Sequence, residues 1–264
     1  MGANAAIVFL GEGLPKDALR DAPPPDPAAS AALAASVLGA PVVEARRGPL
    51  AESTWPREEM IGTASYPDFD LVCFNPLALD RPSDLTEWIE QVSPTGSAYG
   101  FFMHSVVDFC AMAVWEHGTL RRSLSLAPDS GIMEDLGERY DFEGPFWNGD
   151  HSIHYYAPEY PFPFHPLNLG EAALNAWFGF HLEGPPDTEV DAWAFEIPCY
   201  RRAALWQGGR HVCSSRSAAQ RRGGGRADVR RPVVRVRALL GPLAERRRQR
   251  RPRLPEPVVA GDVH

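Results

Sequence analysis

His104, Ser105 and Asp108 form the first group of residues whose types and spacing could do chemistry. A histidine oriented by a carboxylate can act as a general base, and Ser105 or the nearby Cys110 could then act as the nucleophile. However, neighbouring residues of an extended chain point to opposite faces, and the sequence has no GxSxG motif. The alternative is that these side chains satisfy backbone groups at the junction of two strands.

A second group, Asp150, His151, His154 and His165, could bind a metal ion. His151 and His154 are three residues apart, so they would meet one metal on a helix, with Asp150 or His165 completing the site. Glycine and proline in this segment instead indicate a loop, in which histidine and tyrosine side chains lie between the core and water.

A run of carboxylates follows the expected hairpin, at Glu134, Asp135, Glu138, Asp141 and Glu143. Two carboxylates can perform the acid and base steps of glycoside hydrolysis. The more ordinary interpretation, a solvated rim of the domain, is the one that we expect here because charged residues are rarely buried unless they are paired.

The elements that must position these groups are mostly strands. Apolar runs and alternation predict strands at 7–10, 69–74, 99–103, 108–115, 120–126 and 190–197. Residues 46–66 are expected to be mostly loop, and residues 132–136 to form one helical turn.

Three helices are expected to pack on these strands. The first runs from Pro27 to Leu38, with Asp26 as its N-cap, and the third follows Asn168 as N-cap. The second begins at Ser83 and places Leu85, Trp88, Ile89 and Val92 on one face. The predicted fold class is therefore α+β: a mainly antiparallel sheet of about five strands with about three packed helices, plus a disordered C-terminal tail.

The charge distribution divides the chain into two unlike parts. Residues 1–200 contain 9 basic and 30 acidic side chains, a net charge of −21, whereas residues 201–264 contain 17 arginines and 4 acidic residues, a net charge of +13. We therefore predict an acidic domain over residues 1–198 and an arginine-rich disordered tail over residues 199–264.

The tail has two interpretations. Its arginines could bind the phosphates of a nucleic acid, and its Arg-Gly stretches resemble disordered RNA-binding segments. Its composition, which begins abruptly after the last predicted strand, is also typical of out-of-frame or read-through sequence in a GC-rich gene. We prefer the second interpretation, and intact reading frames around codon 200 would contradict it.

The cysteines and the apolar runs indicate in which cellular compartment the protein is expected. The four cysteines are scattered and form no CxxC pair, so reduced thiols are expected. The apolar run at residues 5–10 has no basic residues before it and resembles a buried strand rather than a signal peptide. No stretch approaches the roughly 18 apolar residues that span a bilayer, and a cytoplasmic location without membrane contact is predicted.

Several longer phrases resemble an uncharacterised bacterial family, a domain of unknown function. They are GEG (11–13), MHSVVD (103–108), AVWEHG (113–118), RSLSLAPDSGIME (122–134), GE (137–138), FEGPFW (142–147) and PFHPL (163–167). The resemblance covers about residues 3–197 and does not extend into the tail. It implies a domain boundary but no activity.

The predicted function is that of a non-catalytic cytosolic module that binds a ligand or a protein partner, without a cofactor. Two alternatives stay open. The first is a small hydrolase or metal-dependent enzyme that uses His104 and Asp108 or His151 and His154. The second is nucleic-acid binding through the tail, if the tail is genuine. If residues 1–200 bind a metal ion in a near-stoichiometric amount, and if this metal raises their melting temperature, the enzyme is favoured over the binding module.

Overall fold

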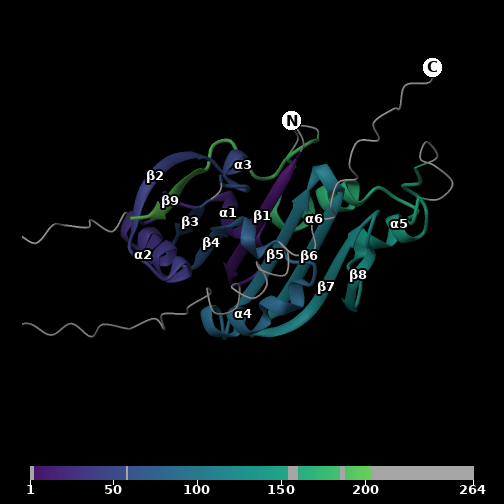
Figure 1. The fold of residues 1–264 in the computed structure, drawn as a ribbon, viewed down its shortest axis with the longest axis horizontal. Helices are drawn as coiled ribbons and strands as arrows, with labels where there is room; N and C mark the ends of the chain where they lie inside the picture. The colour runs from purple at the N-terminus through teal and green to yellow at the C-terminus, as the bar shows by residue number, and fades with distance from the viewer. Residues whose placement is uncertain (1–2, 58, 154–159, 185–187, 204–264) are drawn as a thin grey trace, which may run out of the picture.

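A nine-stranded antiparallel sheet runs through the part of the chain that this computed structural model describes, residues 3–57, 59–153, 160–184 and 188–203 (Figure 1). The strand order is β2-β9-β3-β4-β1-β5-β6-β7-β8. The strands are β1 (Asn4–Gly11), β2 (Val42–Pro49), β3 (Met60–Ser65), β4 (Phe69–Cys73), β5 (Ser97–His104), β6 (Phe109–Glu116), β7 (Thr119–Ala127), β8 (Gly131–Gly137) and β9 (Glu196–Arg202). From residue 204 on, the tail for which the sequence predicts disorder lies outside the described residues.

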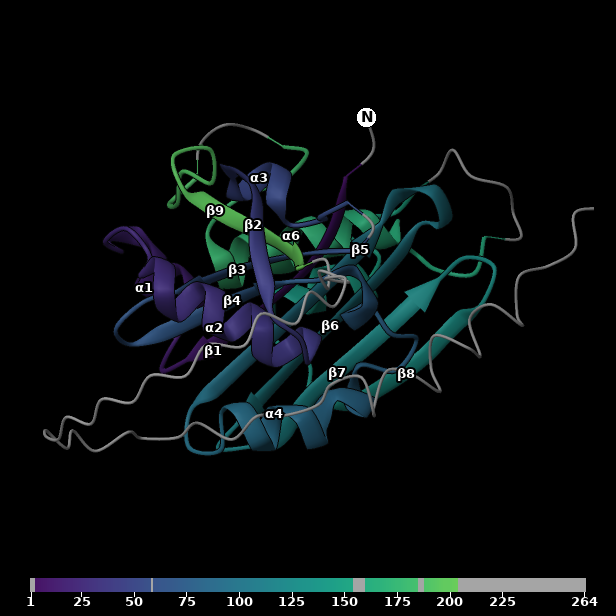
Figure 2. The same cartoon turned by 60° about the vertical axis from the view of Figure 1, so that its left-hand side comes forward.

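Helices cover both faces of the sheet (Figures 1 and 2). Among the described residues they are α1 (Pro15–Arg20), α2 (Pro27–Leu38), α3 (Leu50–Ser53), α4 (Thr86–Val92), α5 (Gly144–Trp147) and α6 (Pro166–Phe178). Short 3-10 turns occupy Asn75–Leu77, Pro82–Leu85, Ser105–Val107 and Asp141–Glu143. Buried side chains of α1, α3, α5 and α6 join the core on one face, here called the α6 face, whereas those of α2 and α4 join the core on the other, the α2 face.

Strand β1 shows why the sheet is covered on both sides. Ala5, Ile7 and Phe9 belong to the core of the α6 face. The residues that alternate with them, at positions 6, 8 and 10, belong to the core of the α2 face. A strand that is buried on both faces needs a continuous apolar run instead of alternation. The run at residues 5–10 is therefore a central strand, hydrogen-bonded to β4 on one side and to β5 on the other.

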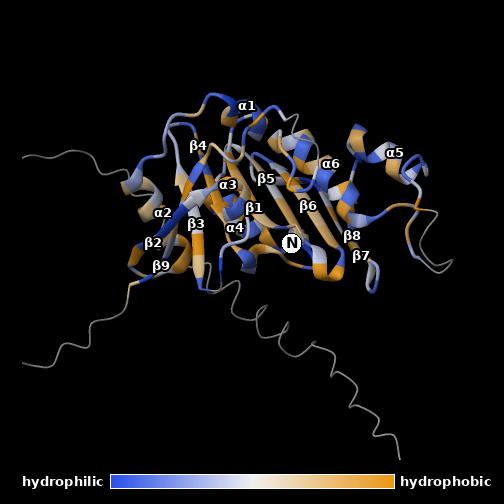
Figure 3. Ribbon diagram, turned by 90° about the horizontal axis from the view of Figure 1, so that it is seen from above, coloured by the Kyte–Doolittle hydropathy of each residue, from blue (hydrophilic) through white to orange (hydrophobic). Residues whose placement is uncertain are grey.

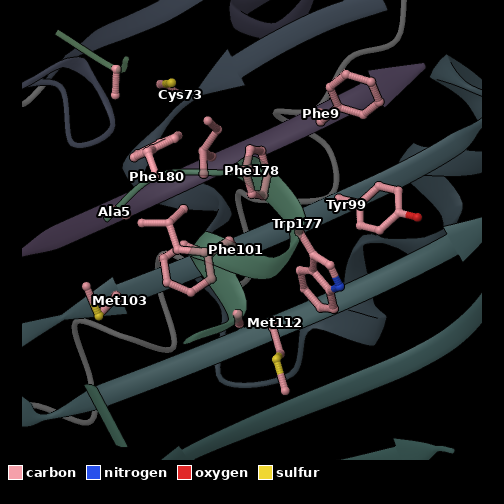
Figure 4. Packing of buried hydrophobic residues seen from close by; sticks show 14 of the residues in the cluster. Ala5, Phe9, Cys73, Tyr99, Phe101, Met103, Met112, Trp177, Phe178 and Phe180 are labelled. Carbon is pink, nitrogen blue, oxygen red and sulfur yellow. The ribbon is translucent and has the colours of Figure 1, made fainter. Parts of the chain in front are cut away.

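The core of the α6 face is rich in aromatic and sulfur-containing side chains (Figure 4). Phe101 and Met112, from neighbouring strands, lie under Trp177 and Phe178 of α6. The hydropathy colouring shows the hydrophobic residues concentrated in the middle of the sheet, at β5 and β6 (Figure 3). Gly170 lets α6 approach these strands closely, because a Cβ there would lie 3.0 Å from Met103 Sδ and 3.2 Å from Cys110 Sγ.

The prediction of about five strands and about three helices is wrong, and the largest omission is in residues 46–66. This segment contains the end of β2, the helix α3 and the whole of β3. Edge strand β2 is mostly exposed and polar, so it carries no apolar pattern. The small residues of β3 fit beneath α2, where Thr63 Oγ1 donates a hydrogen bond to the carbonyl of Ser30 at 2.8 Å.

Two further predictions are corrected at the ends of the sheet. Residues 132–136, predicted to be a helical turn, belong to edge strand β8, which pairs with β7 through a register shift next to Leu126. The last strand, predicted at residues 190–197, is β9 instead, and it runs on to Arg202. Trp193 is 66% exposed, and the side chain of Asp191 accepts hydrogen bonds from the backbone of Trp193 and Ala194, which makes this segment a turn.

The prediction that the carboxylates of residues 134–143 form a solvated rim is also wrong, because two of them, Glu134 and Glu143, are buried. Glu143 and Arg122 are both fully buried and form a two-pronged pair, Nε to Oε1 at 2.9 Å and Nη2 to Oε2 at 2.6 Å. Nη1 of Arg122 donates to Asp135 Oδ1 at 2.6 Å. Glu134 accepts hydrogen bonds from the hydroxyl groups of Ser83 and Ser123. These carboxylates tie β7, β8 and the following turn together.

Candidate functional site

A pocket of about 750 Å³ lies on the α2 face at one end of the central strands. Its walls are α2, the last turn of α4 and the segment 93–96, and its floor is the ends of β1, β3 and β4. Pockets that bind small molecules usually measure about 300–1,000 Å³ and combine apolar walls with a few polar groups. This pocket has that size and construction.

The floor of the pocket is a row of three side chains on neighbouring strands. Asp70 of β4 lies opposite Leu10 of β1 and opposite Ser65 of β3. Directly opposed residues of an antiparallel pair share one face of the sheet. Leu10 belongs to the core of the α2 face, so Asp70 and Ser65 lie on that face as well.

The wall formed by α2 is a stripe of small and apolar side chains: Ala29, Ala32, Leu33 and Ser36. Their spacing follows one side of a helix. The helix is held at its first turn by Asp26, whose side chain accepts hydrogen bonds from the backbone of residues 28 and 29, both at 2.8 Å. Other residues of α2, such as Ala34 and Val37, pack on the sheet, so the stripe is left to face the pocket.

The opposite wall is made by residues 91–96, at and after the end of α4. Gly96 is required here because the chain passes close to the end of β1. A Cβ at position 96 would lie 2.9 Å from Ser93 Oγ and 3.0 Å from the carbonyl oxygen of Gly11. This close approach of the backbone holds the segment 93–96 against the end of β1.

The charges around the pocket are all of one sign. Glu12, Asp68 and Asp70 line it, and no lysine, arginine or histidine does so among the residues that the structure describes. Glu12 and Asp68 are exposed, whereas Asp70 is half-buried on the floor. A concave surface lined by one sign of charge concentrates ions of the opposite sign and repels those of the same sign.

One hydroxyl group in this pocket has no hydrogen-bond partner in the described part of the protein. Ser65 is 2% exposed and its Oγ is buried and unpaired. Thr63, two residues earlier on the same strand, points its hydroxyl group at α2, so alternation directs Ser65 towards the same side. A buried polar group without a partner is costly, and such groups are commonly explained by a function or a bound molecule.

Tyr66 also lines the pocket, but its ring lies on the other face of the sheet, stacked on Phe69 with ring centres 4.2 Å apart. Burial raises the pKa of its hydroxyl group from the ordinary value of 10.0 to about 12, with a smaller contribution from Cys73. The phenol therefore belongs to the core of the α6 face, not to the polar groups of the pocket.

The raised pKa of Tyr66 predicts a loss of stability at alkaline pH. The unfolded chain gives up this proton near pH 10 but the folded chain only near pH 12, so the contribution is complete below about pH 10 and is lost as the pH rises towards about 12. In Tyr66→Phe, the free energy of unfolding should fall less steeply over this interval, as measured by urea titration. Equal slopes in the two proteins would contradict the assignment.

The residues of the first sequence-predicted group lie around the β5–β6 turn. The ring of His104, at the end of β5, packs edge-on against Trp55 with ring centres 5.2 Å apart. Ser105 Oγ lies 3.3 Å from Asn4 Oδ1, which also accepts a hydrogen bond from the backbone of Ser105. Burial raises the pKa of the Cys110 thiol, so its reactive thiolate is disfavoured.

Asp108, from the first predicted group, lies next to His165, from the predicted metal-binding group. Asp108 takes a left-handed backbone conformation, with φ of 48°, and its Oδ2 lies 3.5 Å from His165 Nε2. The other ring nitrogen of His165 accepts a hydrogen bond from the backbone of Leu167 at 3.2 Å. His165 is thereby the N-cap of α6 and links that helix to the β5–β6 turn.

The other predicted metal ligands are placed differently. Asp150 and His151 are exposed, and the ring of His151 stacks on Phe146 with ring centres 4.1 Å apart. His154 lies outside the described residues. Within the described ranges, no group of three or more histidine, cysteine, aspartate or glutamate side chains is arranged to hold a metal ion. Metal binding by the four residues stays a prediction.

Sequence reasoning missed the pocket, although one signal pointed to it. Asp70 is a charged residue inside the otherwise apolar strand β4. A carboxylate in such a place needs a polar environment or a functional reason, because charged residues are seldom buried without one. Ser65 gave no comparable signal, since a serine in a short polar-looking segment is unremarkable.

In the part of the chain that the structure describes, no helix is both long and apolar enough to cross a membrane.

A family model, described as a family of unknown function (DUF6928), matches residues 4–200. No curated protein and no solved structure matches the chain. The match confirms the resemblance that the sequence phrases indicate, while the bacterial origin stays a prediction. Because the model covers about three quarters of the 264 residues, from the start of β1 into β9, the chain belongs to the DUF6928 family.

Proposed function

We propose that this protein is a non-catalytic binding module whose pocket between α2 and the segment 91–96 holds a small organic molecule. The observation that carries the proposal is the pocket itself, about 750 Å³ with a polar floor and a largely apolar helical wall. Ligand sites typically place a few polar groups, which fix the orientation of the ligand, among apolar surfaces that bury the rest of it.

The construction of the pocket supports a preformed site. The floor lies on three hydrogen-bonded strands, and the α2 wall is fixed to the sheet by the bond from Thr63 to Ser30 and by the bond from the backbone of Ser65 to Ser30 Oγ at 3.0 Å. A site on rigid elements loses little conformational entropy when a ligand binds. A ligand would therefore meet a floor and an α2 wall that are already in place.

The proposal predicts that filling the pocket abolishes binding without unfolding the protein. Ala32 is exposed and lines the pocket, so Ala32→Trp should occupy part of the cavity while changing the stability by no more than about 0.5 kcal/mol. A thermal-shift screen of a chemically diverse small-molecule library on the full chain should give compounds that raise the melting temperature of the wild type but not of Ala32→Trp.

The matched control is Ala28→Trp, an equal change at an exposed residue of the same helix that does not line the pocket. The compounds should still stabilise this variant. Compounds that stabilise Ala32→Trp as strongly as the wild type bind elsewhere, and that result would contradict the proposal, as would a library that stabilises nothing.

A further inference from the structure

We infer that the ligand of this pocket is an organic cation, an ammonium or guanidinium group attached to an apolar body. The inference rests on the proposed function and adds the chemistry of the ligand to it. The cationic group would lie at the floor, near Asp70 and Ser65, with the apolar part along the α2 stripe.

The charged side chains that line the pocket favour a cation. Three carboxylates line the pocket, and no basic side chain of the described residues does. The surrounding residues 1–200 carry a net charge of −21, so the long-range field has the same sign as the local one. A field of this sign disfavours phosphates and carboxylic acids and increases the local concentration of cations.

The buried hydroxyl group of Ser65 also favours a hydrogen-bond donor, independently of the charges. This side chain is 2% exposed, has no hydrogen-bond partner in the described chain, and lies opposite Asp70 in the β3–β4 pair. A serine hydroxyl group and a carboxylate can both accept hydrogen bonds, and an ammonium group carries three donors and no acceptor. One bound ammonium group could thus donate to Asp70 and to Ser65 together.

A bare metal ion is a poorer occupant of the same place. The described residues hold no cluster of three potential metal ligands, and much of the lining is carbon, from Leu10 on the floor and from Ala29, Leu33 and Val92 on the walls. Apolar surface stabilises a ligand only by covering apolar parts of that ligand. An alkyl or aryl amine provides both the charge and the apolar surface that this pocket could cover.

The experiment compares cations with neutral molecules of nearly the same shape. Isothermal titration calorimetry on the full chain would use matched pairs: tryptamine with tryptophol, phenethylamine with 2-phenylethanol, and hexylamine with hexanol. The amine should bind at least tenfold more tightly than its alcohol in one or more pairs, and added salt should weaken the amine but not the alcohol.

Substitutions of individual carboxylates then test which of them contacts the cationic group of the ligand. Asp70→Asn keeps the shape of the side chain and should reduce the affinity for the amine about tenfold or more while leaving the alcohol nearly unchanged. Glu12→Gln with Asp68→Asn changes only exposed residues at the mouth, so folding is not at issue, and it should weaken the amine less. Asp129→Asn, an exposed carboxylate that does not line the pocket, is the control and should change nothing.

The possible results separate the two proposals. Alcohols that bind as tightly as their amines, and that Ala32→Trp excludes, would overturn the cation and leave the binding pocket in place. Amine binding that survives in Asp70→Asn and in the Glu12→Gln, Asp68→Asn double variant would also overturn it. Failure of every pair to bind the wild type would contradict both the inference and the proposed function.

Discussion

Replacing Glu143 by alanine should lower the free energy of unfolding by about 3–5 kcal/mol, because the buried guanidinium group of Arg122 would lose its main partner. Both side chains are fully buried, and the pair makes two hydrogen bonds of 2.9 and 2.6 Å. Glu143 also accepts a hydrogen bond from the backbone of Tyr140 at 3.0 Å, so its loss leaves a second donor unpaired. Urea unfolding of the full chain measures the change.

An exposed ion pair on the same strand provides the control. Arg121 contacts Glu116 at 2.9 Å, and both side chains are about half exposed. Pairs of this kind contribute about 0–1 kcal/mol, so Arg121→Ala should change the stability little. A third variant, Arg122→Met with Glu143→Leu, removes both buried charges and should recover part of the loss. Equal effects of Glu143→Ala and Arg121→Ala would contradict the buried network.

Replacing Trp115 by alanine should lower the free energy of unfolding by about 3–5 kcal/mol, the usual range for a large aromatic side chain removed from a core. Trp115 is 0% exposed and lies on the α2 face of β6. Its indole nitrogen donates a hydrogen bond to Thr86 Oγ1 at 3.0 Å, which ties the start of α4 to the sheet. Both the cavity and the lost contact with α4 contribute to the expected effect.

Trp193 is the matched control because the same substitution there removes a side chain that is 66% exposed. Trp193→Ala should change the stability by no more than about 0.5 kcal/mol. The two variants lose the same number of atoms, so chemical denaturation compares a buried, hydrogen-bonded tryptophan with an exposed one. A similar destabilisation of both variants would show that the sheet and α4 are not packed as described.

Elements with strong local signals could be predicted from the sequence. Helix α2 has the predicted bounds, and Asp26 caps it as expected. The β6–β7 hairpin is confirmed as well, with positive φ at His117 and Gly118 in its turn. In these places the capping residue or the turn residue is next to the element that it ends, so the information is contained in a short stretch of sequence.

Elements that depend on distant contacts could not be predicted. β3 has only small residues after Ile61, and it becomes a buried strand because α2 covers it and β4 and β9 flank it. The sequence predicts Asn168 as the N-cap of α6, but the helix begins at Pro166 and its N-cap is His165, a residue not usually counted as a cap. The same limit applies to the candidate site, since Ser65 and Asp70 face one pocket only after β3 and β4 pair.

The position of β9 has a consequence for how the chain can be synthesised and folded. Among the described strands, β2 pairs with β9 alone, and β9 separates it from β3, although β9 begins about 150 residues later in the chain. While a ribosome is still making the preceding residues, β2 has no neighbour and β3 presents an open backbone edge. Unpaired strand edges in a nascent chain are sites of aggregation. The release of β9 from the ribosome, rather than the collapse of the central hairpins, would therefore end the period in which this protein is prone to aggregate.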